Sequence, residues 1–119
     1  MATQPIIDRT EAIARLNDRA RLGLDPTARI VITRNCLAAF CDIETVETVV
    51  VQAKLLAAFR RCSFSSDSPE RDFAEILFRG KRVWLKVDYY DAAMEYGSPD
   101  PADASVTTRV ITILLPEDY

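Results

Sequence analysis

The sequence predicts an α+β fold, a two-layer sandwich in which two helices cover a mainly antiparallel sheet of about four strands. Two observations predict this fold. Segments with helical and strand patterns follow one another in the order α-β-α-β-β-β. The chain has 119 residues, of which 49% are hydrophobic and 28% charged, as is typical of a globular domain. We therefore expect a single α+β domain over residues 1–119.

The segment that follows Asp8 is predicted to form a helix over about residues 9–22. Asp8 can cap the first turn, and Glu11 stands where a capping box has its acid. Gly23 follows the last turn, where a residue in the left-handed conformation commonly ends a helix. The apolar stripe of this helix consists of Ile13, Leu16 and Ala20. A run rich in β-branched residues, Arg29–Thr33, then predicts a strand.

A second helix is predicted from about Asp42, which can cap it, to about Arg61. Acidic residues near its start and basic residues near its end suit the helix dipole. The run Val49–Val51 leaves a strand as the competing interpretation. The predicted buried face consists of Ile43, Val46, Val50, Ala53, Leu56 and Ala57. The preceding residues 35–41 are expected to form a connection, with room for one turn of helix.

The polar segment Ser63–Arg71 predicts a loop, and a hairpin is predicted after it. The hairpin strands are expected over Phe73–Phe78 and Arg82–Tyr90. They are joined at Arg79-Gly80-Lys81, where glycine at the first central position suits a tight turn. A connection over Asp91–Ala104 then leads to a last predicted strand, Ser105–Leu115.

Strict alternation along the second hairpin strand divides its side chains between two faces. The members of one face are Val83, Leu85, Val87 and Tyr89. The members of the other face are Trp84, Lys86, Asp88 and Tyr90. If the helices leave this second face open, it forms an amphipathic platform of the kind enriched at protein interfaces. If they cover it, Trp84 belongs to the core and Lys86 must pair with an acid.

The composition excludes several classes of enzyme. The chain contains no histidine, which removes Ser-His-Asp and Cys-His nucleophile systems and histidine-based zinc sites. Cys36, Cys41 and Cys62 match no zinc spacing, and we expect free, mostly buried thiols in a reducing compartment. No sequence motif of a phosphate-binding loop or a hydrolase is present. We therefore expect no catalytic residue, no metal and no cofactor.

The charges are distributed unevenly along the chain, whose net charge is −3. Residues 63–119 contain 6 basic and 11 acidic side chains, which argues against nucleic-acid binding by this half. Near the N-terminus, a cluster of arginines predicts a solvated helix face, with a nucleic-acid or partner patch as the alternative. Its members are Arg9, Arg15, Arg19 and Arg21. Residues 1–12 show no secretory signal and no stretch could span a membrane, so we expect a cytoplasmic protein.

The strongest candidate site is the stretch 88–103, which contains no basic residue. Its members are Asp88, Tyr89, Tyr90, Asp91, Glu95, Tyr96, Asp100 and Asp103. Clustered carboxylates could bind Mg²⁺ or Ca²⁺, although their spacing does not follow the calcium-loop pattern. Carboxylates beside aromatic rings could instead dock onto a cationic partner surface. A solvated loop whose acids cap its own turns is the third interpretation.

The C-terminal third resembles a bacterial family catalogued as domain of unknown function 3768. The resemblance is carried by W-L-K-V-D-Y-Y-D at 84–91, Y-G-S-P-D-P-A-D at 96–103 and T-T-R-V-I-T-I at 107–113. Weaker similarity extends to residues 13–18 and 30–33, and the chain departs from the pattern over 35–42. The resemblance implies a small cytosolic protein, often carried on plasmids and other mobile elements, with no established activity. It also adds Gly97 and Arg109 to the candidate positions.

Three hypotheses for the function follow from these patterns. The first is a non-catalytic protein that docks an acidic and aromatic surface onto a protein partner, for example as an inhibitor of a CRISPR or restriction complex. Its candidate binding residues are Trp84, Asp88, Tyr89, Tyr90, Asp91, Glu95, Tyr96, Asp100, Asp103 and Arg109. The second is a carboxylate-based enzyme, with or without a metal ion, that acts on nucleotides or nucleic acid and uses Asp88 and Asp91 as its acid and base. The third is a homodimeric accessory protein that pairs through a strand edge or the Trp84 face.

Overall fold

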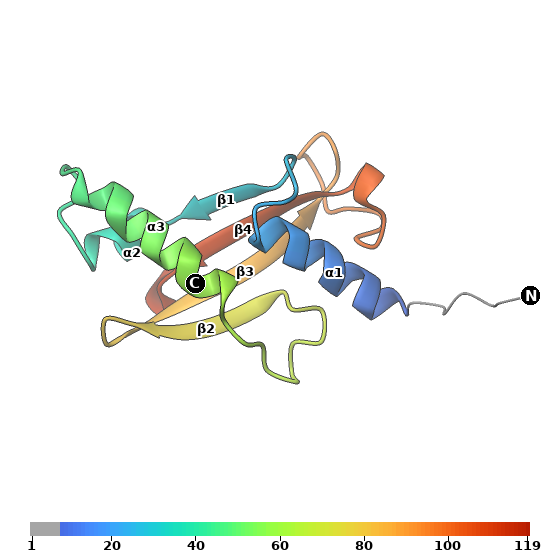
Figure 1. Cartoon of the computed structure of the whole chain (residues 1–119). Helices are drawn as coiled ribbons and strands as arrows, with labels where there is room; N and C mark the ends of the chain where they lie inside the picture. The colour runs from blue at the N-terminus through green and yellow to red at the C-terminus, as the bar shows by residue number, and fades with distance from the viewer. Residues whose placement is uncertain (1–7) are drawn as a thin grey trace, which may run out of the picture.

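The computed structural model describes residues 8–119. The prediction that residues 1–12 contain no secretory signal therefore lies largely outside the described residues. Its elements are α1 (Arg9–Arg21), β1 (Arg29–Ile32), α2 (Arg34–Ala38), α3 (Glu47–Arg60), β2 (Phe73–Phe78), β3 (Lys81–Tyr90), η1 (Ala104–Val106), β4 (Thr108–Leu114) and η2 (Pro116–Asp118). The strands form a four-stranded sheet in the order β1-β4-β3-β2. Helices α1 and α3 both lie over one face of this sheet (Figure 1). The α+β class is therefore confirmed.

The sheet is mixed, because one of its edge strands runs parallel to its neighbour. Strand β3 pairs antiparallel with both β2 and β4, as the hairpin pattern predicts. Strand β1 pairs parallel with β4, and Ile30 lies opposite Ile111 in this register. A parallel pair needs a long crossover connection, and the chain between β1 and β4 contains α2, α3 and the hairpin.

Helix α1 confirms the helix predicted over residues 9–22, including both of its ends. The Asp8 carboxylate accepts hydrogen bonds from two backbone N–H groups of the first turn, at 2.7 and 3.3 Å. Gly23 has a φ of +79°, the left-handed conformation expected after the last turn. The buried members of the expected apolar stripe are Ile13 and Ala20. Leu16 is only partly buried, and the polar Asn17 is buried beside it.

The segment after β1 contains a short helix, α2, where the sequence predicts a connection with room for one helical turn. The strand ends one residue earlier than expected because Thr33 caps α2, its hydroxyl accepting a hydrogen bond from the Cys36 N–H at 3.2 Å. Cys36 is fully buried, as expected of a free thiol in a core. Burial raises the pKa of this thiol to about 11, so it is protonated at neutral pH.

Helix α3 confirms the helical interpretation of residues 42–61 and corrects two details of it. The helix begins at Glu47, because the Asp42 carboxylate caps a separate turn by accepting the Glu44 N–H at 3.1 Å. The predicted buried face is wrong. Its members Val46, Val50 and Ala53 are exposed, and Ile43, Leu56 and Ala57 are only half-buried. The side chains of α3 that are buried are Val51, Leu55 and Phe59.

The loop over 63–71 and the hairpin strands lie where the sequence predicts them, and the turn differs in one detail. Phe78 pairs with Lys81, so the two-residue turn consists of Arg79 and Gly80. Both residues have positive φ, 50° and 81°, as a type I′ turn requires. Gly80 therefore takes the second central position rather than the first.

The last strand begins later than the sequence predicts. Residues 104–106 form η1, whose preceding residue Asp103 accepts a hydrogen bond from the Ser105 N–H at 2.9 Å. This cap holds the chain in a helical turn, and β4 starts only at Thr108. None of the helices in residues 8–119 is long and apolar enough to cross a membrane.

The hydrophobic core lies between the three helices and one face of the sheet, which we call the covered face. Side chains that alternate along β3 and β4 supply the sheet half of the core, as the strand periodicity predicts. The fully buried apolar members include Val51, Leu55 and Phe59 of α3, Val83 and Leu85 of β3, and Ile111 and Ile113 of β4. The helices therefore use the covered face for all of their packing on the sheet.

The corrected face of α3 predicts opposite outcomes for two truncations on this helix. Leu55→Ala should lower the free energy of unfolding by about 2–5 kcal/mol, because it leaves a cavity in the core. Val49→Ala removes a side chain that is 67% exposed and should change stability by less than about 0.5 kcal/mol. Urea denaturation at low micromolar protein measures both values, and equal losses would contradict the assigned face.

Candidate functional site

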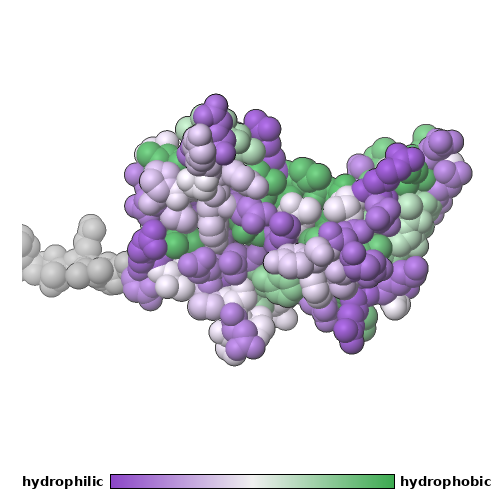
Figure 2. Space-filling view, turned by 180° about the vertical axis from the view of Figure 1, so that it is seen from behind, coloured by the Kyte–Doolittle hydropathy of each residue, from purple (hydrophilic) through white to green (hydrophobic). Residues whose placement is uncertain are grey.

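The second face of the sheet, which we call the open face, is left uncovered by the helices α1, α2 and α3 (Figure 1). Figure 2 looks onto the molecule from this side and shows hydrophobic and hydrophilic residues interspersed across it. Strand register places its members side by side: Arg29 and Val31 of β1, Thr108, Val110, Thr112 and Leu114 of β4, Trp84, Lys86, Asp88 and Tyr90 of β3, and Phe73, Glu75 and Leu77 of β2. The platform that the alternation of β3 allows is therefore present.

Three aromatic side chains meet on the open face, and we call them the aromatic cluster. The Trp84 ring lies at its centre, with ring centroids 5.2 Å from Phe73 and 6.0 Å from Tyr119 in edge-to-face arrangements. Glu75 lies directly opposite Trp84 on β2 and accepts the indole N–H at 2.6 Å. This hydrogen bond and the two ring contacts fix the orientation of the indole.

A turn that follows β4 brings Tyr119 over the sheet, where it borders a shallow hollow on the open face. The hollow is lined by Thr33, Lys86, Thr112, Leu114, Asp118 and Tyr119. Asp118 accepts hydrogen bonds from the Asn35 side chain at 3.0 Å and the Thr33 hydroxyl at 2.8 Å. These bonds lower the pKa of Asp118, so the carboxylate stays ionised and holds the turn in place. Lys86 lies 5.9 Å from the centre of the Tyr119 ring.

The charges of the open face are largely paired within the chain. Lys86 forms an ion pair with Asp88 at 3.0 Å, although the sequence predicts such a pair only for a face that helices cover. Glu75 is held by the Trp84 indole, and Asp118 by Thr33 and Asn35. The face is therefore amphipathic without a strong excess of either sign.

The structure divides the predicted acidic stretch 88–103 between the open face and a connection that folds on itself. Asp88 and Tyr90 lie on the open face. In the connection, Asp91 accepts the Glu95 N–H at 3.0 Å, Asp100 accepts the Ala102 N–H at 3.1 Å, and Asp103 caps η1. Hydrogen bonds from the Ser105 hydroxyl and N–H lower the pKa of Asp103. Three of the predicted acids thus stabilise local turns.

Other members of this stretch remain exposed or pair elsewhere. Tyr96 is 73% exposed, and Glu95 beside it is also exposed. Gly97 forms a bridge with Tyr90 and closes the first turn of the connection. Asp100 pairs with Arg9 at 2.9 Å and so links the connection to α1. Residues 8–119 contain no group of three or more His, Cys, Asp or Glu side chains that could hold a metal ion.

Tyr89 and Arg109 lie on the covered face, so the prediction that they contact a partner is corrected. Arg109 is only 1% exposed. Its Nε donates to the Asn17 side-chain oxygen at 2.7 Å, its Nη2 donates to the Pro101 carbonyl, and its guanidinium lies 5.1 Å from the Tyr89 ring centre. The Tyr89 hydroxyl accepts from Asn17 at 2.8 Å and donates to Glu70 at 3.1 Å. Together these residues form a buried polar network that joins α1 to the sheet.

Burial shifts the pKa values of Arg109 and Tyr89, the two members of this network that the sequence analysis named as candidates. Desolvation lowers the pKa of Arg109, and the nearby Tyr89 and Asp25 oppose that shift. Desolvation raises the pKa of Tyr89, whose hydroxyl therefore stays protonated at neutral pH. Sequence reasoning did not single out Asn17, the residue that connects them, because a polar side chain next to the apolar stripe of a helix carries no signal that it is buried.

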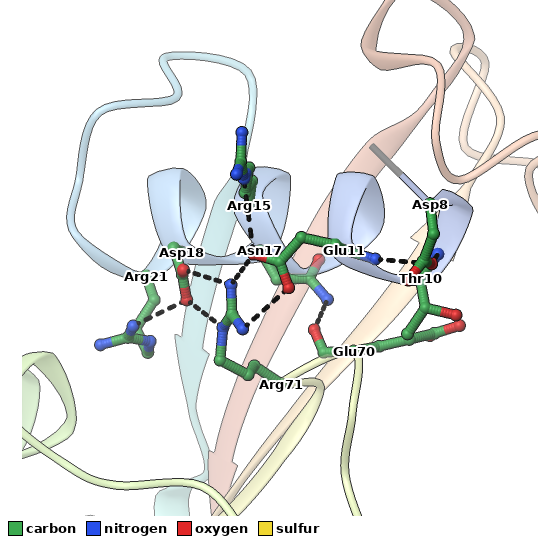
Figure 3. Close-up of polar contacts among 9 residues, drawn as sticks. All are labelled: Asp8, Thr10, Glu11, Arg15, Asn17, Asp18, Arg21, Glu70 and Arg71. Atoms are coloured by element: carbon green, nitrogen blue, oxygen red, sulfur yellow. Dashed lines mark hydrogen bonds and ion pairs between the residues drawn. The ribbon is translucent and has the colours of Figure 1, made fainter. Parts of the chain in front are cut away.

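A second polar network joins α1 to the loop before β2 (Figure 3). Arg71 contacts Asp18 at 2.8 Å and Glu11 at 3.3 Å, and Arg21 contacts the same Asp18 at 3.0 Å. Hydrogen bonds from Arg71 lower the pKa of Glu11. Burial raises the pKa of Asp18, hydrogen bonds from Arg71 and Arg21 lower it, and the net shift is downward. Arg71 has a φ of +55°, a conformation that these contacts support.

The predicted arginine cluster of α1 is taken up by contacts within the chain. Arg9 pairs with Asp100, Arg15 with Glu11 and Arg21 with Asp18. Arg19 donates to the Leu24 carbonyl at 3.2 Å. Arg21 also donates to the Phe59 carbonyl at 2.9 Å and so ties the end of α3 to α1. Arg9, Arg15 and Arg19 are exposed, as the solvated-face interpretation expects, whereas Arg21 is nearly buried and links α1 to α3.

Comparison with known proteins gives a family and no more specific relative. A sequence model of the family described as protein of unknown function, DUF3768, matches residues 42–118. The match includes α3 and the strands β2, β3 and β4, so it contains most of the open face. It confirms the resemblance over 84–113, whereas segments 13–18 and 30–33 lie outside it. No curated protein and no solved structure matches the chain.

The buried network predicts strong coupling between Asn17 and Arg109. Asn17→Ala leaves the Arg109 Nε without its acceptor in the core and should lower the free energy of unfolding by about 3 kcal/mol. The double variant Asn17→Ala/Arg109→Met removes both partners, and its loss should fall short of the sum of the single losses by about 0.5–3 kcal/mol. Urea denaturation of the four proteins measures this cycle, and additive losses would show that the two side chains act independently.

The second network predicts a dependence of stability on pH. Because the pKa values of Glu11 and Asp18 are lowered in the folded protein, their contribution is present above the unfolded pKa and is lost as pH falls through the folded pKa. Arg71→Gln should therefore destabilise the protein at pH 6–7, and the difference from the unmutated protein should shrink below about pH 4. Urea denaturation of both proteins from about pH 3 to pH 7 measures this difference in the free energy of unfolding. A difference that stays constant with pH would show that Arg71 does not stabilise the ionised forms of Glu11 and Asp18.

Proposed function

The chain belongs to the DUF3768 family, whose function is unknown, and we propose that it is a non-catalytic binding protein that docks a protein partner through the open face. The observation that carries this proposal is the aromatic cluster of Phe73, Trp84 and Tyr119 on the sheet face that α1, α2 and α3 leave uncovered. Large aromatic side chains that remain accessible on a rigid sheet are typical of the anchor positions of protein interfaces.

The geometry of the aromatic cluster favours tight docking because its central ring is already ordered. The indole N–H of Trp84 is satisfied by Glu75, and Phe73 contacts the ring from the neighbouring strand. Little conformational entropy is therefore lost at this position when a partner binds. Phe73 is 39% exposed and Tyr119 is 84% exposed, so apolar area remains for a partner to cover.

The charge pattern of the open face favours a protein over a nucleic acid. A base-stacking surface combines its aromatic rings with a positively charged groove. Lys86, which lies beside the aromatic cluster, is neutralised by Asp88, and the other neighbours of the cluster include Glu75 and Asp118. Because these carboxylates are engaged within the chain, a protein partner that presents apolar side chains to the rings fits this face better than a polyanion does.

The proposal narrows the acidic and aromatic surface that the sequence predicts. Trp84, Asp88 and Tyr90 belong to the open face, and Glu95 and Tyr96 remain candidates as an exposed pair in the connection. The remaining predicted residues are engaged within the chain. They are Tyr89, Asp91, Asp100, Asp103 and Arg109.

A finer form of the proposal identifies the partner as a component of a bacterial defence complex, such as a CRISPR or restriction complex. It rests on the mobile-element carriage that the family resemblance implies and on the acidic C-terminal half. Added to a purified complex of that type, the protein should inhibit cleavage of DNA at near-stoichiometric amounts. Full activity at a large excess of the protein would remove that complex from consideration.

Substitution of single aromatic residues tests the open face. The partner is captured from a bacterial lysate on the immobilised protein, identified by mass spectrometry, purified and titrated by calorimetry. Trp84→Ala and Tyr119→Ala should each weaken binding by more than about tenfold, because they remove anchor rings from the interface. Tyr96→Ala tests the alternative surface in the connection: this tyrosine is 73% exposed, against 84% for Tyr119, and lies outside the aromatic cluster. If the partner docks on the open face, this variant should change the affinity by less than about twofold.

Circular dichroism of each variant shows whether the fold is retained. A partner whose affinity falls with Tyr96→Ala but not with Trp84→Ala would move the binding surface to the connection. A partner that binds all three variants equally, or the absence of any captured protein, would overturn the proposal.

A further inference from the structure

Helix α3 has a second apolar face, opposite the one that packs on the sheet. At 100° per residue, Val51, Leu55 and Phe59 define the buried side of the helix. The positions on the opposite side carry Val46, Val49, Val50, Ala53 and Ala57, and we call them the outer stripe. Val46, Val49 and Val50 are 87%, 67% and 47% exposed.

The valines of the outer stripe are exposed, so packing within the described residues does not explain them. Valine has a lower helix propensity than alanine, lysine or glutamate, so a solvated helix face gains nothing from it. Exposed apolar side chains that recur on one helix face mark an interaction surface. The first half of α3 lies at an outer end of the molecule, where a second helix could approach it (Figure 1).

The charges that flank the outer stripe indicate what covers it. Glu47 and Lys54 lie on the same flank of the helix, seven positions apart, and both are exposed. When two copies of α3 pair antiparallel about a twofold axis near residues 50 and 51, Glu47 of each copy meets Lys54 of the other. In a symmetric parallel pair, the flanks that carry these two residues lie on opposite sides of the seam, so Glu47 and Lys54 would find no partner across it. The charge pattern is therefore complementary to itself in one orientation.

The sizes of the apolar side chains fit the same arrangement. With the twofold axis near residues 50 and 51, Val46 of one copy lies at the level between Ala53 and Ala57 of the other. The large side chain thus faces two small ones, as close packing of helices requires. Val49 and Val50 meet their counterparts near the axis. We propose that this protein forms a homodimer through an antiparallel pairing of the outer stripes of α3.

The expected dimer is weak and leaves the open face free. A helix of 14 residues is about 21 Å long, so the pairing buries less than the roughly 800 Å² per partner of a standard interface. We therefore expect a dissociation constant in the micromolar range or above. The outer stripe and the open face lie on opposite sides of the molecule, so the proposal does not depend on the proposed function.

Exchange of the two charges tests the orientation. Sedimentation velocity of the full chain from about 5 to 500 µM should show a monomer–dimer equilibrium. Glu47→Lys and Lys54→Glu should each weaken the dimer by at least about fivefold, because each creates two like-charge contacts by symmetry. The double variant Glu47→Lys/Lys54→Glu restores opposite charges and should return the dissociation constant to within about twofold of the original.

Three further variants complete the test. Val49→Glu places a charge in the centre of the stripe and should abolish dimerisation, with the fold retained because this side chain is exposed. Asp67→Lys is the control for net charge, since this residue is exposed in the loop before β2, and it should leave the dimer unchanged. Trp84→Ala should also leave it unchanged. A monomer at all concentrations, a dimer lost with Trp84→Ala but not Val49→Glu, or no rescue by the double variant would each overturn the proposal.

Discussion

The buried guanidinium of Arg109 is the interaction on which the arrangement of the layers depends. It is 1% exposed, and none of its contacts in the structure is an ion pair with a carboxylate. A charge removed from water in this way requires polar partners at fixed positions. They come from α1 through Asn17, from the connection before β4 through Pro101, and from the ring of Tyr89. Helix α1 and the connection are thereby both fixed to the covered face.

The same constraint leaves the other face of the sheet without a cover. The helices that could shield it pack on the covered face, and the connection that Arg109 holds is drawn toward that side as well. The turn after β4 does reach the open face, where Asp118 bonds to Thr33 and Asn35 and brings Tyr119 beside Trp84. The aromatic cluster is thus a consequence of how the polar groups of the chain are satisfied.

Local signals in the sequence predict most elements of this fold, and non-local competition decides the rest. The Asp8 cap and the alternation of β3 are fixed by neighbouring residues, so both were predicted correctly. The buried face of α3 was not, because apolar residues recur with helical spacing on two sides and only the sheet selects between them. The burial of Arg109 could have been inferred, since it alternates with Ile111 and Ile113 on β4. Its place in a family motif suggested an exposed site instead.

The two surfaces that remain apolar differ in chemistry, and the difference explains why we assign them different partners. A domain of this length buries only about two-thirds of its unfolded surface, so some apolar groups stay outside the core. Beside the outer stripe of α3, Glu47 near one end and Lys54 near the other carry opposite charges. They are complementary to a second copy of the same helix that runs in the reverse direction. On the open face, Lys86 and Asp88 are already paired, and the accessible surface is aromatic. A surface whose charges are satisfied internally selects a partner by shape and apolar contact, whereas one with separated opposite charges can select itself.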